Sequence, residues 1–284
     1  MTFTTIVSPV ALRERLGDPG VVVFDCRHSL TDLTFGRRLY DEAHVPGAFF
    51  ADLEEDTAGT KTGKNGRHPL PDPEAFARFL RAAGVSDSTQ IVAYDEGADV
   101  FAARLWFLSR WIGHDAAAVL DGGFAGWTAC GYPVTAAPSE PAREGTLTVR
   151  LHPEFLVDAE YVRAHLEAPE MQLVDARAKE RYTGETEPMD PVAGHIPGAR
   201  HRWWAENYDA SGKLKSAETL RGEFVAAGFE AAQTVHQCGS GISATVNHLA
   251  MVHAGLQGSR VYNGSWSEWV SDPSRPIARG PAAR

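Results

Sequence analysis

The sequence predicts an α/β protein made of two tandem copies of one domain, each a mostly parallel sheet flanked by helices. Three observations support this fold class. Short β-branched runs alternate with helix-like segments along the chain. Landmarks of the first half recur in the same order in the second half. The length of 284 residues fits two ordinary domains of about 100–200 residues each.

The recurring landmarks are an Asp-x-Arg motif after an apolar run, a His-x-Pro-Gly motif, the end of a buried strand and a late tryptophan. Their first members are Asp25, His44, Asp95 and Trp127, and their second members are Asp175, His195, Cys238 and Trp269. A Pro- and Ala-rich stretch over 136–141 has the composition of a linker. We therefore expect a first domain over 1–138, a linker over 139–150 and a second domain over 151–284.

The expected elements follow the same order in both copies. Buried strands are expected over 21–25, 91–94 and 117–120, and again over 172–175, 234–237 and 258–262. Helices are expected over 73–83 and 100–112, and then over 158–167, 216–227 and 242–254. Asp72 as N-cap with Pro73 behind it marks the start of the first helix.

Composition excludes several classes of function. The chain has 27 basic and 37 acidic residues, a net charge of −10, which disfavours binding to nucleic acid or to an anionic membrane surface. No apolar run approaches the ~20 residues that span a bilayer, and the start of the chain lacks the pattern of a signal peptide. Three widely spaced cysteines predict no disulfide framework and no metal site, so we expect a cytoplasmic protein.

The two copies differ in one chemically important position. Asp95 ends a strand in the first copy, where the second copy has Cys238 followed by Gly239, Ser240, Gly241, Ile242 and Ser243. Small residues at a strand end allow backbone N–H groups to form an anion-binding loop, and the helix after it adds its positive end. A thiol there is expected to be a nucleophilic thiolate rather than an inert buried cysteine. Cys26 and Cys130 are expected to be buried small hydrophobes.

With these motifs the chain resembles the two-domain rhodanese superfamily, and within it the 3-mercaptopyruvate and thiosulfate sulfurtransferases, from about residue 8 to 273. The resemblance implies a silent first domain, in which Asp95 replaces the cysteine, and a catalytic second domain. It implies that an anionic donor, 3-mercaptopyruvate or thiosulfate, passes sulfur to Cys238 as a persulfide. A thiophilic acceptor (cyanide, a small thiol or thioredoxin) then removes this sulfur. Neither a cofactor nor a metal is implied.

The resemblance also implies substrate-binding residues. The loop residues Gly239, Gly241, Ile242 and Ser243 surround the thiol, and the family's first substrate arginine matches Arg181. Arg177 is either a further substrate contact or an ion-pair brace, since Arg27 has the same place in the silent copy. The family's second substrate arginine has no counterpart in the stretch 184–191. Arg67 and Arg104 are both candidates to replace it.

A proton relay is implied as well. Ser240 matches the family's loop serine and His68 matches its histidine. The acid of this relay matches Glu54 best, with Asp52 as the second choice. In this relay a carboxylate orients the histidine, which polarises the serine.

Three alternatives remain. A cysteine phosphatase needs an arginine six positions after the cysteine, where this chain has Ala244. A non-catalytic rhodanese module typically lacks the cysteine, which this chain keeps. Between the two donors, the neutral Gly239 and Ser240 favour 3-mercaptopyruvate, because thiosulfate-preferring rhodaneses usually carry bulky basic residues there; the missing second arginine keeps thiosulfate as the alternative.

Overall fold

A computed structural model describes residues 2–166 and 168–281. The chain divides into two compact units. Unit 1 comprises Met1–Ala58, Pro71–His152 and Tyr208–Leu214. Unit 2 comprises Gly59–Leu70, Pro153–Asn207 and Lys215–Arg284. A segment of the first half, Gly59–Leu70, thus belongs with the second sheet, which becomes important at the candidate active site.

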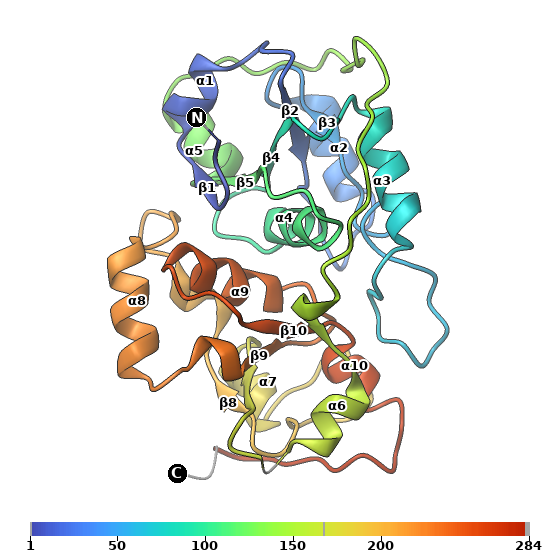
Figure 1. Cartoon of the computed structure of the whole chain (residues 1–284), viewed down its shortest axis with the longest axis vertical. Helices are drawn as coiled ribbons and strands as arrows, with labels where there is room; N and C mark the ends of the chain where they lie inside the picture. The colour runs from blue at the N-terminus through green and yellow to red at the C-terminus, as the bar shows by residue number, and fades with distance from the viewer. Residues whose placement is uncertain (1, 167, 282–284) are drawn as a thin grey trace. The chain divides into compact units, whose positions relative to one another are not determined.

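Unit 1 contains a five-stranded, fully parallel sheet with the order β1-β5-β4-β2-β3. Its strands are β1 Ile6–Val7, β2 Val21–Asp25, β3 Phe49–Phe50, β4 Gln90–Tyr94 and β5 Ala117–Leu120. Its helices are α1 Pro9–Glu14, α2 Phe35–Glu42, α3 Pro73–Ala82, α4 Phe101–Trp111 and α5 Gly123–Ala129 (Figure 1). The core on one face joins Leu12 of α1 and Trp127 of α5 to the sheet, and Phe79 of α3 packs against Phe24 of β2.

Unit 2 repeats this architecture. Its parallel sheet has the order β6-β10-β9-β7-β8. The strands are β6 Leu156–Val157, β7 Gln172–Asp175, β8 Arg200–His201, β9 Thr234–Gln237 and β10 Arg260–Tyr262. The helices are α6 Ala159–Ala164, α7 Lys179–Thr183, α8 Ala217–Ala226, α9 Ala244–His253 and α10 Ser265–Trp269, with 3₁₀ turns at Pro153–Phe155, Trp204–Asn207 and Ala231–Gln233 (Figure 1).

The fold class predicted from the sequence is confirmed: each repeat is an α/β unit whose five parallel strands occupy equivalent places. The central strands β2, β5, β7 and β9 have the predicted bounds. The helix predicted over 158–167 ends at Ala164, and Glu167 lies outside the described residues. The predicted linker, 139–150, is grouped with unit 1, where Arg81 donates hydrogen bonds to the carbonyl of Leu147. The predicted domain boundaries themselves stay a prediction.

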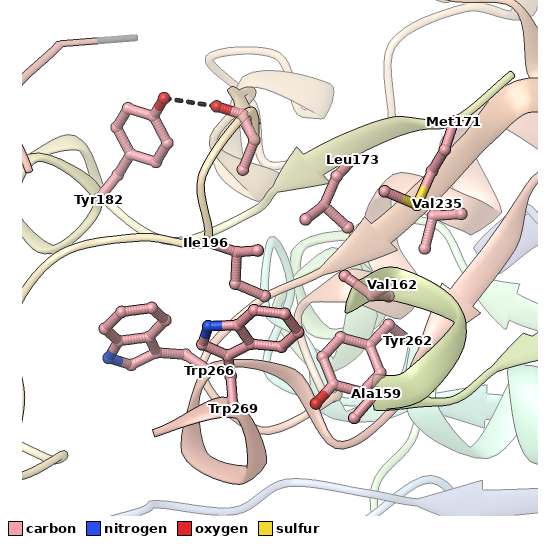
Figure 2. Packing of buried hydrophobic residues seen from close by; sticks show 11 residues of the cluster. Ala159, Val162, Met171, Leu173, Tyr182, Ile196, Val235, Tyr262, Trp266 and Trp269 are labelled. Atoms are coloured by element: carbon pink, nitrogen blue, oxygen red, sulfur yellow. Dashed lines mark hydrogen bonds between the residues drawn. The ribbon is translucent and has the colours of Figure 1, made fainter. Parts of the chain in front are cut away.

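The core of unit 2 lies between its sheet and the two helices α6 and α10. Trp266 and Trp269 of α10 are both fully buried and lie near Ile196 and the strand residue Tyr262 (Figure 2). Each indole satisfies its N–H group, Trp266 on the carbonyl of Val192 and Trp269 on that of Pro276. Burying two indoles removes several hundred Å² of apolar surface from water, and this firmly anchors the loop that leads into α10.

Two further observations concern the sequence-based expectations. Within residues 2–166 and 168–281, no helix is long and apolar enough to cross a membrane. The expectation that both cysteines of unit 1 are buried is wrong for one of them: Cys26 is buried, but Cys130 is exposed. Cys130 is the C-cap residue of α5, so it follows the last turn that packs on the sheet.

Candidate active site

Cys238 lies at the end of the central strand β9, in a loop that enters α9. The strand is buried along its whole length, and the thiol is only 2% exposed. Ser243 is the N-cap of α9, so the five residues after Cys238 bend the chain around the sulfur. This is the place in a parallel sheet where ligands usually bind.

The hydrogen bonds around the thiol favour its charged form. The N–H of Gly241 donates to Cys238 Sγ at 3.1 Å. Burial alone raises the pKa of Cys238, but the Ser243 side chain and the N–H groups of Ser240, Ala244 and Gly241 outweigh it and lower the pKa below the usual thiol value. A thiolate held by several donors in this way is both stabilised and available as a nucleophile.

The loop is fixed by the neighbouring segment that follows β10. The Cys238 N–H donates to Ser265 Oγ at 3.0 Å, and the Trp266 and Ser267 N–H groups donate to the carbonyls of Cys238 and Gly239. Gly241 adopts a left-handed φ of 84°, and a Cβ there would lie 2.2 Å from the Asn263 carbonyl oxygen. Gly241 is therefore required by both backbone conformation and space.

His68 and Ser240 meet in unit 2, although 172 residues separate them. His68 Nδ1 and Ser240 Oγ lie 2.8 Å apart, in a hydrogen bond whose direction depends on the imidazole tautomer. Both side chains are buried. The carbonyl of His68 also accepts a hydrogen bond from Asn263, which ties the histidine to the segment that supports the cysteine loop.

Two guanidinium groups lie over Gly239, the residue next to the nucleophile. A Cβ at Gly239 would be 3.0 Å from Arg67 Nη2, and 3.2 and 3.3 Å from the two Nη atoms of Arg181. Two buried carboxylates hold these groups: Glu187 accepts from Arg181 at 2.8 Å, and Asp190 accepts from both Arg181 and Arg67. Burial raises the pKa of Asp190, and its hydrogen bond with Arg67 opposes this rise.

Arg177 has the contacts of an ion-pair brace. It donates to Asp175 at 2.6 Å and to the carbonyl of Gly194 at 2.8 Å, and its guanidinium lies over the ring of Trp266. Arg27 of unit 1 makes the equivalent contacts, with Asp25 and the carbonyl of Ala43. Because unit 1 has the same brace without a cysteine loop, a structural role explains Arg177 better than a substrate contact does. Arg177 also donates to Glu187 and so supports the carboxylate that holds Arg181.

The other sequence candidates lie in unit 1. Glu54 follows Asp52, which accepts a hydrogen bond from the Glu54 N–H, and both carboxylates act on His28, opposing the lowering of its pKa by burial. Arg104 is fully buried in α4 and donates to the carbonyl of Thr57. Since His68 and Arg181 belong to unit 2, the acid of the relay stays a prediction.

Unit 1 has a carboxylate at the position equivalent to Cys238. The Asp95 carboxylate accepts hydrogen bonds from the N–H groups of Gly97 and Ala102, so it occupies the kind of cradle that Cys238 has in unit 2. Burial raises the pKa of Asp95 to about 6. A carboxylate in this position offers no nucleophilic sulfur.

Several residues that build the site are not among the candidates predicted from the sequence. Glu187 and Asp190 hold the arginines, Ser265 supports the cysteine loop, and Asn263 holds the backbone of His68. The carboxylates had a visible signal in the sequence, since three acidic residues, Glu185, Glu187 and Asp190, follow Arg181 within nine residues. Ser265 had none, because its role depends on a left-handed backbone with φ of 55°.

Comparisons with known proteins agree with this fold. Two segments of the chain, residues 8–130 and 158–272, match the rhodanese-like domain. A protein of Pseudomonas aeruginosa named "Probable 3-mercaptopyruvate sulfurtransferase" is 43% identical over 284 residues, covering 99% of this chain and 100% of its own length. The thiosulfate sulfurtransferase of Cricetulus griseus is 33% identical, over 94% of this chain and 91% of its own.

A solved structure shows the same architecture over nearly the whole chain. The crystal structure of SseA from Escherichia coli, described as a 3-mercaptopyruvate sulfotransferase, superposes with a TM-score of 0.81 at 30% identity. The match covers 93% of this chain and 99% of that one. The fold and the site define an α/β protein of two rhodanese-like domains, the second of which carries a buried cysteine at the end of strand β9. The chain belongs to the rhodanese-like domain family.

Proposed function

We propose that this protein is a sulfurtransferase that moves sulfur from 3-mercaptopyruvate, through a persulfide on Cys238, to a thiophilic acceptor. One observation carries the proposal: a buried thiol with a lowered pKa lies in a loop of N–H donors, and two guanidinium groups lie over Gly239, the next residue in the chain. The relatives with sulfurtransferase names support the reaction class.

In the first half-reaction the Cys238 thiolate attacks the sulfur atom of 3-mercaptopyruvate. A sulfur–sulfur bond forms and the carbon–sulfur bond breaks, and its electron pair leaves on the carbon as the enolate of pyruvate. One proton then converts the enolate to pyruvate. The cysteine sulfur is oxidised to the persulfide while the donor carbon is reduced. The loop N–H groups that stabilise the thiolate also stabilise the anionic persulfide.

In the second half-reaction the acceptor attacks the outer sulfur of the persulfide. With cyanide the products are thiocyanate and the restored Cys238 thiol, so atoms and charge balance without a redox cofactor. A small thiol takes the outer sulfur as its own persulfide, and the two thiols of reduced thioredoxin release it as hydrogen sulfide while they form a disulfide. A nucleophilic thiol and an odd number of widely spaced cysteines support a reducing, cytoplasmic setting for this chemistry.

Each loop residue has a role in this proposal. Gly241, together with Ser243 and the N–H of Ser240, holds the sulfur anion. Gly239 leaves room for the arginine groups, and Ile242 contributes its carbonyl to fixing the first turn of α9. Arg181 binds the anionic end of the donor. Ser240, oriented by His68, donates a hydrogen bond to the donor carbonyl as it becomes an enolate.

Thiosulfate is the alternative donor, because it is also a small anion with a transferable sulfur. The deciding experiment is a side-by-side measurement of kcat/KM for 3-mercaptopyruvate and thiosulfate with cyanide as acceptor. We expect a higher value for 3-mercaptopyruvate, since only that donor has a carbonyl for Ser240 to polarise. A clear preference for thiosulfate would contradict the donor assignment, and turnover of neither donor would contradict the function.

The variant Ser240→Ala is expected to lower kcat for 3-mercaptopyruvate by about 10- to 100-fold and to change thiosulfate turnover less than threefold or so. The physical reason is that the enolate oxygen loses a donor that the thiosulfate reaction does not use. Ser211→Ala, at an exposed turn of unit 1, is the matched control and should match the wild type. Equal losses with both donors would show that Ser240 only supports the loop.

A further inference from the structure

Arg67 places a second guanidinium group, beside that of Arg181, over Gly239. We infer that Arg67 acts with Arg181 to bind the anionic group of the sulfur donor over Gly239. This inference rests on the proposed function and extends it by naming the residue that completes donor recognition. The stretch 184–191 contains no arginine, and of the two other candidates, Arg67 and Arg104, the inference favours Arg67.

The backbone around Arg67 is held on both sides. Its N–H donates to Ser267 Oγ at 3.0 Å, and the carbonyl of the next residue, His68, accepts from Asn263. Gly66 has a left-handed φ of 82°, and a Cβ there would lie 2.8 Å from the carbonyl oxygen of Gly264. The segment 263–267, which supports the Cys238 loop, thus also fixes the backbone at Arg67.

Each of the two guanidinium groups has one nitrogen outside its hydrogen bonds to the carboxylates, and both of these nitrogens lie over Gly239. Arg67 uses Nη1 on Asp190, and Arg181 uses Nε and Nη2 on Glu187 and Asp190. Within residues 2–166 and 168–281, Arg67 Nη2 and Arg181 Nη1 have no protein acceptor. These nitrogens lie 3.0 and 3.3 Å from the point where a side chain at Gly239 would begin.

The charges around this space fit a small anion. Asp190 bridges the two guanidinium groups and offsets their mutual repulsion, and both it and Glu187 are only 3% exposed. A carboxylate or thiosulfate group has two or more oxygen acceptors at a spacing that matches two converging N–H donors. An anion bound over Gly239 would lie beside the residue that follows Cys238 in the chain. The same geometry explains glycine at 239, because a side chain would displace both arginines.

The test compares Arg67→Ala, Arg67→Lys and the wild type. For Arg67→Ala we expect KM for both donors to rise about 10- to 100-fold while kcat changes less than threefold or so. Arg67→Lys keeps the charge but loses the planar fork, so it should recover part of this loss. Lys64→Ala is the matched control, because Lys64 is an exposed residue of the same segment, and it should behave like the wild type.

A second readout separates donor binding from a structural role. The rate at which cyanide removes sulfur from persulfide already formed on Cys238 should be the same in Arg67→Ala and the wild type. An unchanged KM for both donors would overturn the inference, and so would an equal slowing of the two half-reactions. Neither result affects the proposed function, which fails if the wild type turns over neither donor or if Cys238 proves dispensable for sulfur transfer.

Discussion

Replacing Cys238 by serine is expected to abolish sulfur transfer from both 3-mercaptopyruvate and thiosulfate while leaving the fold intact. The serine hydroxyl has nearly the same shape as the thiol and can accept the hydrogen bond that the Gly241 N–H now donates to sulfur. It does not ionise at neutral pH, however, and an oxygen cannot carry a sulfane sulfur as a persulfide. The loss should therefore exceed about 1,000-fold in kcat.

The control for this variant is Cys130→Ser, since Cys130 is an exposed cysteine of unit 1. It should retain wild-type turnover. Thermal unfolding of Cys238→Ser should remain within a few degrees of the wild type, because a change of less than about 1 kcal/mol shifts the midpoint little in a chain of this size. Wild-type turnover by Cys238→Ser would contradict the mechanism.

Arg181→Ala is expected to lower kcat/KM by about 100-fold or more for both donors. A bidentate contact between a guanidinium and an anion is the strongest hydrogen bond available to the site, and about 100-fold corresponds to about 3 kcal/mol of transition-state stabilisation. The substitution removes the proposed contact with the sulfur donor. It also removes the ion pairs of Arg181 with Glu187 and Asp190. The measurement is steady-state kinetics with each donor in turn.

The matched control is Arg163→Ala, which removes an exposed arginine from α6 of the same unit, where its partner is the exposed Glu160. Exposed ion pairs contribute about 0–1 kcal/mol, so neither its stability nor its kinetics should change measurably. If Arg181→Ala keeps its fold and an unchanged kcat/KM, donor recognition does not depend on this arginine.

The main elements of the fold were predictable because they are encoded locally. The strand β2 combines three valines with Phe24 and is bounded by glycine before it and by the Asp-x-Arg motif at its end, so its apolar run identifies it without tertiary information. The edge strands β1, β3, β6 and β8 each have only two residues. They form through register with a neighbouring strand, and two residues are too few for any periodic pattern.

The candidate site divides in the same way. The Cys238 loop was predictable because the nucleophile, its glycines and the start of α9 are contiguous in the sequence. The contact between Arg67 and Asp190 joins residues 123 positions apart, and no local pattern indicates it. The hydrogen bond between His68 and Ser240 was expected only from the resemblance to the rhodanese superfamily, since the residues themselves do not show which loops meet.

The most direct test of the central claim is the intact mass of the protein after reaction with 3-mercaptopyruvate in the absence of an acceptor. We expect a gain of one sulfur atom per chain, located on the peptide that contains Cys238 and removed when cyanide is added. The Cys238→Ser variant should gain none. Addition of sulfur to Cys26 or Cys130 in place of Cys238, or turnover without any added sulfur, would contradict this claim.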